Sequence, residues 1–431
     1  MSTNNAKWLL SLIVNLVLCF LLSCTTNNVA TSVSTEVLAT PSLGASVSQM
    51  PILPTTNKLI LVYPIENRCA KTLPTEQLIP DVNDALLMLS ADPYMAYLFD
   101  LVNMNKKELT FESNVTPFDI ILSPNRKLAA MTMLTKVHPS QTTKLMIIDA
   151  AGAIKKEIAW KSEWGRISAW LDNHRLLIAK QADLQLSQYN PVSFILLDLN
   201  TGQDNEVQVT YPDLNQVGYV NWNLINYIFS PDFTRVLYPT SRVDPGNVNY
   251  VAFWDTEHEQ VLATLPVELT ETSMPQWSPD GSKVLVSGLA SKSGETSTAW
   301  RGQELFTIDR NGKITQLTHF TDYYPGTTAI QEYTWSPDGR NVAFWLQTKQ
   351  MDKPQLITLN VNTGKAINHC ISASFIYGAS RPIWSPKGDY LLIDRQESAD
   401  AVSQIFLLDI SQNAVAQIAE SDTPVGWMVS P

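Results

Sequence analysis

Aromatic side chains gathered in a few polar segments are the residues of this sequence best suited to contact a ligand or partner. Three segments that join predicted strands are long and aromatic, namely 211–223, 319–331 and 371–381. Exposed Tyr and Trp rings near Arg are common on binding surfaces, and flat rings also suit sugar stacking. The residues predicted to bind are Tyr219, Trp222, Trp300, Arg301, Tyr323, Tyr324 and Tyr377. The alternative is that these rings pack their loops onto the core below.

Motifs of known catalytic chemistry are absent from the sequence. There is no Gly-x-Ser-x-Gly elbow, His-Glu-x-x-His, Cys-x-x-Cys, P-loop or dinucleotide-binding glycine pattern. The five His residues stand alone at 138, 174, 258, 319 and 369, and each is interpreted as a surface or structural residue. We therefore predict no catalytic residue, no metal site and no cofactor, while enzymatic activity stays undecided.

The four cysteines have different predicted fates. Cys19 lies in an apolar leader and Cys24 directly follows it. Cys69 and Cys370 remain, an even pair. A disulfide between them suits an oxidising compartment, and two buried free thiols are the alternative.

The N-terminus predicts an address outside the cytoplasm. Lys7 precedes an apolar run, 8–22, that is short for a bilayer span of about 20 residues. The run ends in Leu21-Leu22-Ser23-Cys24, which resembles the bacterial lipobox and implies acylation of Cys24. Residues 1–23 are thus interpreted as a lipoprotein signal peptide, and an ordinary signal peptide or membrane anchor is the alternative. We expect lipid anchoring to the bacterial cell membrane, facing the periplasm or cell surface.

The composition of the next segment predicts a flexible tether. Residues 25–56 contain seven Thr, five Ser, three Pro and one charged residue, Glu36. Such a composition cannot bury enough apolar surface to offset its ordering entropy. We predict an acylated Cys and disordered tether over 24–56, and a single folded domain over 57–431.

Overall composition limits the classes of partner. The 431 residues are 45% hydrophobic and 16% charged, with a formal net charge of −11. This hydrophobic content is enough to form a large buried core. The chain is acidic and has no block of basic residues, so nucleic acid is an unsuitable partner.

An internal repeat sets the architecture. Its clearest copies are Trp-Ser-Pro-Asp-Gly at 277–281 and 335–339 and Trp-Ser-Pro-Lys-Gly at 384–388, with weaker copies at 122, 170 and 229 and a seventh at 427. Ser-Pro-Asp-Gly suits a type I turn, because Pro presets φ and Asp and Gly favour the later positions. Asp232, Asp280 and Asp338 are therefore read as turn residues rather than cation ligands. The repeated Trp residues are predicted to lie in the core.

A second motif alternates with the first. Seven apolar strands end in or near Asp or Asn, at 97–101, 145–149, 194–198, 251–255, 305–309, 356–360 and 405–409. Each repeat then supplies four short antiparallel strands, and packing such sheets around an axis buries both faces. The sequence thus predicts an all-β fold, a β-propeller of seven four-stranded blades, or six if the N-terminal part is an appendage. Strands at 58–63, 97–101 and 108–111 would pair with 425–429 to close the ring.

The Trp-Ser-Pro-Asp-Gly repeats resemble those of TolB-like, WD40-like (PD40-type) propeller lipoproteins. They are also similar to the propeller domain of prolyl oligopeptidase-like proteins, although no hydrolase elbow is present. The TolB resemblance implies protein partners in the envelope, and a shared fold does not fix an activity.

The interpretation that combines these features is a lipid-anchored, non-catalytic binding or scaffold protein. Its partner would be an envelope protein or a surface glycan. One alternative is an enzyme or binding protein that acts on extracellular glycan or peptide at the axial funnel of the propeller. Another is a sensor subunit that reports to a separate membrane protein.

Overall fold

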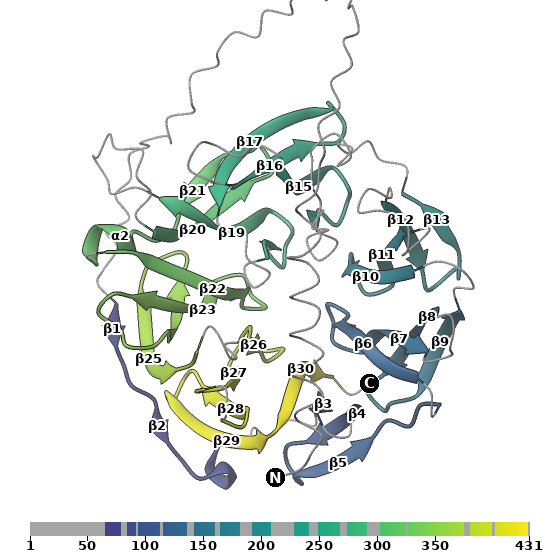
Figure 1. Cartoon of the computed structure of the whole chain (residues 1–431), viewed down its shortest axis with the longest axis horizontal. Helices are drawn as coiled ribbons and strands as arrows, with labels where there is room; N and C mark the ends of the chain where they lie inside the picture. Colours follow the sequence, from purple (N-terminus) through teal and green to yellow (C-terminus); the bar gives the residue numbers. More distant parts are fainter. Residues whose placement is uncertain are drawn as a thin grey trace, which may run out of the picture. The chain divides into compact units, whose positions relative to one another are not determined.

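The protein is nearly all β in the parts of the chain that the structure describes (Figure 1). The computed structural model describes residues 65–78, 84–91, 94–112, 115–135, 142–159, 164–181, 192–207, 228–240, 249–267, 274–290, 302–324, 326–374, 380–398 and 401–429. These residues all belong to one compact unit, Thr56–Pro431. Within these ranges, no helix combines the length and apolar character needed to cross a membrane.

The Ser-Pro turns join neighbouring strands as their residue types predict. In the turn between β18 (Gln276–Trp277) and β19 (Lys283–Ala290), the Gly281 N–H donates to the Ser278 carbonyl over 2.8 Å. The Ser278 hydroxyl donates to Asp280 over 2.5 Å. The same side-chain bond links Ser336 to Asp338 and Ser230 to Asp232. The three carboxylates are therefore turn residues, as expected.

Three sheets each contain four consecutive antiparallel strands. The first comprises β6 (Val115–Leu122), β7 (Leu128–Thr135), β8 (Thr142–Asp149) and β9 (Ile154–Ala159). The second comprises β10 (Trp164–Trp170), β11 (Arg175–Gln181), β12 (Val192–Asp198) and β13 (Asp204–Glu206). The third comprises β14 (Ile228–Phe229), β15 (Arg235–Thr240), β16 (Asn249–Asp255) and β17 (Gln260–Val267).

A nine-stranded sheet contains two runs of four strands and one added strand. The first run is β18, β19, β20 (Gly302–Asp309) and β21 (Ile314–Gln316). The second is β22 (Thr328–Trp335), β23 (Asn341–Thr348), β24 (Gln355–Asn360) and β25 (Ala366–Ser372). The two runs meet at Gly302, which pairs with Thr328 in parallel. A side chain at Gly302 would collide with the Thr328 backbone, so this close approach requires glycine.

The next sheet has four antiparallel strands and one added parallel strand. Its strands are β26 (Ile383–Trp384), β27 (Tyr390–Arg395), β28 (Gln404–Asp409) and β29 (Ala414–Glu420), with β2 (Lys71–Thr72) on β29.

The last sheet joins the C-terminal strand to three strands from the N-terminal part of the chain. The C-terminal strand β30 (Asp422–Met428) pairs with β3 (Ala85–Ala91), which continues into β4 (Tyr94–Asp100) and β5 (Asn105–Glu108). The strands predicted from the sequence differ from this sheet in two details. The prediction did not include β3, and it placed at 108–111 the strand that the structure places at 105–108. The predicted strand at 58–63 lies outside the described residues.

Within the described residues, seven hydrophobic clusters each pack one run of four strands against the next run. Leu87 of β3 and Met131 of β7 share one of them, and Trp427 of β30 packs with Leu407 of β28 in another. The repeat Trp residues lie at these contacts, as predicted. The Trp384 Nε1–H, for example, donates to the Thr334 carbonyl of the preceding group over 3.4 Å. Equivalent bonds run from Trp170, Trp277 and Trp335 to the carbonyls of Ile121, Ile228 and Gln276.

Candidate functional site

A segment near the N-terminus, residues 65–78, lies along the outer edges of two sheets, and we call it the strap. Its β1 (Glu66–Asn67) pairs in parallel with β25, and β2 pairs in parallel with β29. Further backbone bonds run from the Arg68 N–H to the Asn368 carbonyl and from the Leu73 N–H to the Val415 carbonyl. The strap ends in a short 3-10 helix, η1 (Thr75–Gln77). It therefore links groups of strands that are about 300 residues away in the sequence.

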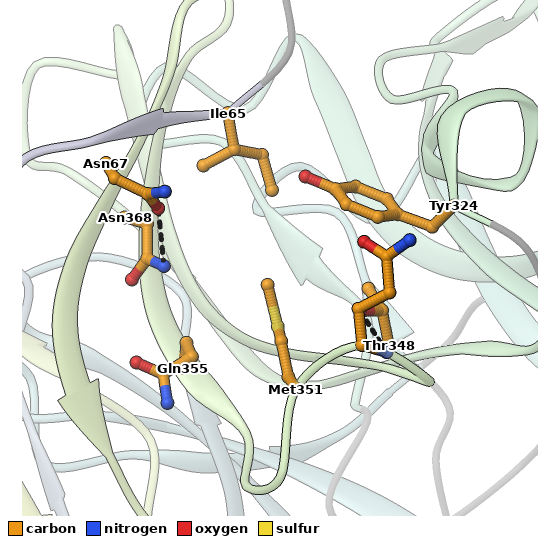
Figure 2. A pocket seen from close by; sticks show the side chains of 8 residues that line it. Ile65, Asn67, Tyr324, Thr348, Met351, Gln355 and Asn368 are labelled. Carbon is orange, nitrogen blue, oxygen red and sulfur yellow. Dashed lines mark hydrogen bonds between the residues drawn. The ribbon is translucent and has the colours of Figure 1, made fainter.

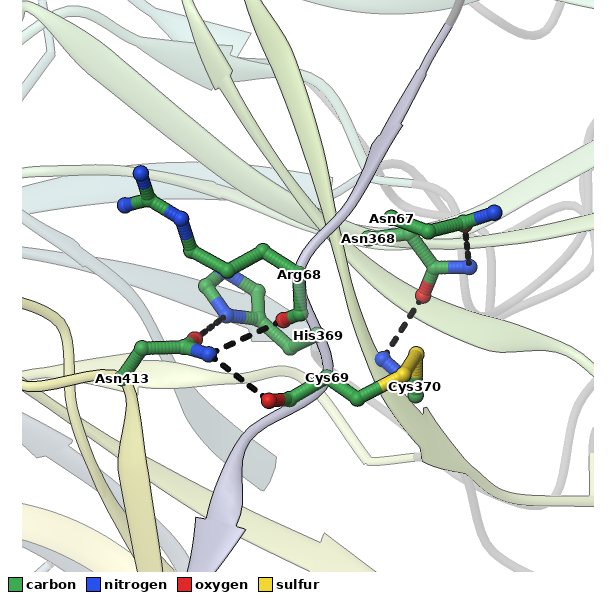
Figure 3. The surroundings of a disulfide bond; sticks show 7 residues. All are labelled: Asn67, Arg68, Cys69, Asn368, His369, Cys370 and Asn413. Carbon is green, nitrogen blue, oxygen red and sulfur yellow. Dashed lines mark hydrogen bonds between the residues drawn. A yellow bond between two sulfur atoms is a disulfide. The ribbon is translucent and has the colours of Figure 1, made fainter.

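A disulfide attaches the middle of the strap. Cys69 is bonded to Cys370 of β25, and both residues are exposed. Beside it, the Asn413 side-chain amide donates to the Arg68 and Cys69 carbonyls, each over 3.0 Å (Figure 3). The strap is thus fixed by one covalent bond and by hydrogen bonds from both sheets that it crosses.

The joint beneath the strap contains a buried histidine. His369 of β25 is 2% exposed, with its ring nitrogens 2.8 Å from the Thr358 hydroxyl and 2.8 Å from Asn413 Oδ1. Burial lowers the pKa of His369, which favours the neutral ring. This histidine has the structural role that the sequence predicted, because Thr358 ties it to the neighbouring strand of its own sheet and Asn413 ties it to the next sheet.

A pocket of about 270 Å³ opens between the strap and the sheet that contains β23 to β25 (Figure 2). Its walls come from the strap, the residue that follows α2 (Phe320–Tyr323), the end of β23 with the β23–β24 turn, the start of β24 and the middle of β25. The lining residues are Ile65, Asn67, Tyr324, Thr348, Gln350, Met351, Gln355 and Asn368. This lining includes no charged or titratable side chain except the Tyr324 phenol, so the pocket is polar and neutral.

A buried carboxylate fixes the helical turn that precedes Tyr324. Glu304 of β20 is 0% exposed and accepts hydrogen bonds from the Thr318 hydroxyl and the Thr321 N–H, each over 2.6 Å. Burial raises the pKa of Glu304, and these donors oppose that effect. The ring of Phe320 also packs against Phe344, so α2 has a defined position. Glu304 therefore acts through α2 to place Tyr324 at the pocket.

The structure separates the two neighbouring tyrosines that the sequence treats alike. Tyr324 lines the pocket and packs against a hydrophobic cluster, whereas Tyr323 is 50% exposed and outside the lining. The segment 319–331 is also not a continuous loop, because it contains α2 and the first residues of β22. The other predicted binding residues, Tyr219, Trp222, Trp300, Arg301 and Tyr377, lie outside the described residues, as does Cys24.

Sequence reasoning missed most of the pocket. Asn67 and Gln355 lie at the ends of β1 and β24, and Asn368 lies within β25. The repeat pattern gives these amides no special status. Asn67 and Asn368 become neighbours because β1 pairs with β25, where the Asn368 amide donates to Asn67 Oδ1 over 3.1 Å. No local signal in the sequence encodes that pairing.

A second polar group lies on β22, away from the pocket lining. Glu332 has a positive φ within a β-bulge, and its carboxylate lies 3.5 Å from Arg381 Nε. Burial raises the pKa of Glu332 to about 7, although the Arg381 charge opposes the rise. A carboxyl with a pKa near neutral pH is well suited to donate or accept a proton.

Replacing this carboxyl should change how stability depends on pH. The pKa of Glu332 is raised from an ordinary value of 4.5, so the folded state retains a proton that the unfolded chain has lost. The wild-type protein should therefore lose up to about 3 kcal/mol relative to Glu332→Gln as pH rises from 4.5 to above 7. Denaturant unfolding at pH 5 and pH 8 measures this difference. Glu108→Gln, at an exposed position of β5, is the control, and parallel pH profiles for all three proteins would contradict the prediction.

Comparisons with known proteins give limited similarity. No family model matches the sequence. A stretch of 122 residues, 28% of this chain, is 30% identical to the uncharacterized peptidase YuxL of Bacillus subtilis, and it spans 16% of that protein's length.

Three solved structures are similar at low sequence identity. A prolyl endopeptidase structure has a TM-score of 0.46 and 14% identity, with 79% of this chain and 49% of that chain covered. The β-propeller domain of the Trilobed protease from Pyrococcus furiosus has a TM-score of 0.42 and 12% identity, covering 71% and 86%. Oligogalacturonate lyase with manganese has a TM-score of 0.38 and 13% identity, covering 83% and 78%.

Proposed function

We propose that this protein is a lipid-anchored, non-catalytic binding protein of the bacterial cell envelope, which holds a neutral ligand in the pocket beneath the strap. The observation that carries this proposal is the pocket itself. It is concave, it is walled by segments far apart in the sequence, and its lining offers amides, a hydroxyl and an aromatic ring without a carboxylate or cation. Such a lining can orient a polar ligand but supplies no strong acid or base.

The fold that positions this pocket is, in this proposal, a seven-bladed β-propeller of the TolB-like type. The sheets supply seven runs of four antiparallel strands, counting two in the nine-stranded sheet. The seven clusters each connect two successive runs. The pairing of β30 with β3 completes one run from the C-terminal strand and three strands of the N-terminal part. Closure of a ring removes exposed faces that separate sheets would leave, and this favours seven blades over six.

The location rests on two further observations. The Leu21-Leu22-Ser23-Cys24 sequence supplies the acylation signal, and the tether composition of 25–56 separates the anchor from the folded domain. The exposed Cys69–Cys370 disulfide suits an oxidising compartment such as the periplasm or cell surface. An envelope protein or a surface glycan remains the proposed partner.

The lipid anchor and the partner are testable in cells. Wild-type protein should incorporate a labelled fatty acid and sediment with membranes, and Cys24→Ser should lose both properties. Cross-linking followed by mass spectrometry should then identify an envelope component that Tyr324→Ala loses and Tyr323→Ala retains. Equal labelling of wild type and Cys24→Ser would contradict the anchor, and equal capture by both Tyr variants would contradict the pocket as the site.

One observation favours a second candidate function, an enzyme acting on extracellular glycan or peptide. Glu332 lies on β22, the first strand of its run, and such strands line the axis of a propeller. Its carboxyl has a pKa of about 7 beside Arg381. Turnover of a glycan or peptide that Glu332→Gln abolishes would establish this function and overturn the non-catalytic one.

A further inference from the structure

We propose that the pocket beneath the strap binds a single neutral sugar ring, recognised by amide side chains on one wall and by the Tyr324 ring on the other. This inference rests on the proposed binding function and names its ligand class.

The two walls of the pocket differ in chemistry. Figure 2 shows Asn67 and Asn368 on one side and Tyr324 opposite them, with Ile65 and Met351 between. A pyranose has the same division, because its hydroxyl groups project outward while its C–H groups form apolar faces. An aromatic ring packs against such a face, and the amides meet the hydroxyls.

The hydrogen-bonding groups of the pocket fit hydroxyls. The Asn67 oxygen is used by Asn368, which leaves the Asn67 amide hydrogens as donors. The Gln355 amide donates to the Lys353 carbonyl, which leaves its oxygen as an acceptor. The Tyr324 phenol is protonated at neutral pH and can donate, and burial raises its pKa further. Each sugar hydroxyl both donates and accepts, and this mixed set can satisfy both roles.

The charges around the pocket favour a neutral ligand. Glu66 of β1 forms ion pairs at the surface. Its carboxylate lies 2.8 Å from Lys365 and 3.7 Å from Arg68. None of these three lines the pocket. A carboxylate or phosphate entering it would lose hydration without gaining a counter-charge, which is unfavourable.

The sheet edges disfavour a peptide. An extended peptide commonly binds by adding a strand to an open edge. At this pocket β1 already occupies the outer edge of β25, and β24 lies between β23 and β25, so the open edge that remains is that of the two-residue β1. The volume of about 270 Å³ also lies just under the range of roughly 300–1,000 Å³ for pockets that hold drug-sized ligands. A single ring fits this size and needs no strand edge, whereas an extended peptide would find only two residues of β1 to pair with.

The test is calorimetric titration of the full chain in a detergent without a sugar headgroup. The probes are the methyl glycosides of glucose, galactose, mannose and N-acetylglucosamine, the free acids glucuronate and galacturonate, and a capped trialanine. At least one neutral glycoside should bind saturably, with the acids at least about tenfold weaker. Tyr324→Ala should weaken glycoside binding by about tenfold or more, while Tyr324→Phe, which keeps the ring, should lose about two- to fivefold.

Tyr323→Ala is the matched control, since this neighbour lies outside the lining, and it should bind like wild type. Gln355→Ala provides a second pocket variant if Tyr324→Ala does not fold. Saturable glycoside binding that neither pocket variant weakens, or no glycoside binding at all, would overturn the inference. Tyr324-dependent binding of capped trialanine alone would overturn the sugar assignment and leave the binding function intact. Conversion of any probe into product would overturn the non-catalytic function.

Discussion

Replacing Cys69 and Cys370 together by serine is expected to lower the free energy of unfolding by about 2–5 kcal/mol. The disulfide joins residues 301 positions apart, so its loss frees a very long loop in the unfolded chain. In the folded protein the strap would keep its backbone bonds to β25 and β29 but lose its covalent attachment. Denaturant unfolding under oxidising conditions measures the change.

A dithiol reductant provides the control for this variant. Reduction should destabilise the wild-type protein by a similar amount and leave the double variant unchanged, because both cysteines are exposed to the reductant. Ligand affinity should also fall in the variant, since Ile65 and Asn67 of the strap form part of the pocket wall. Equal stability of the oxidised wild type and the double variant would show that the strap is held by its hydrogen bonds alone.

Truncating Trp384 is the second large expected effect. Trp384→Ala should cost about 3–5 kcal/mol, because the ring is 2% exposed within a cluster that includes Trp345 and Leu391. The variant also removes the donor to the Thr334 carbonyl of the preceding run. Denaturant unfolding, monitored by circular dichroism, measures the loss.

Trp277 supplies a graded comparison for Trp384. It occupies the same repeat position and donates a corresponding bond to the Ile228 carbonyl over 3.3 Å, but its ring is only partly buried. Trp277→Ala should therefore cost roughly half as much as Trp384→Ala. Equal losses would mean that the shared hydrogen bond, rather than ring burial, dominates the role of the repeat tryptophans.

The repeat made the strand groups predictable from sequence. Short-range chemistry determines a turn such as Ser278–Gly281, because Ser, Pro, Asp and Gly each favour their own place in it. Apolar runs of four to six residues next to the turns then specify short buried strands. Trp384 could be assigned to the core for the same reason, since it recurs at one position of a repeat that must pack against its neighbour.

The pocket could be predicted only in part. Tyr324 was a candidate from its aromatic segment, but Tyr323 had equal standing in the sequence. The local turn α2, fixed by Glu304 of a different strand, decides which of the two rings faces the pocket. A contact made by a residue 17 positions away on β20 leaves no mark in the composition of the loop itself.

The sequence alone therefore determined the all-β character, the repeated turns and the inward position of the repeat tryptophans, because each depends on residues within one repeat. The tertiary structure decided where the strap runs, which amides gather beside Tyr324, and that Cys69 meets Cys370. Those features depend on pairing between the N-terminal segment and strands about 300 residues later. Such pairing is set by the edges that the packed sheets leave open, and these edges exist only once the sheets have formed.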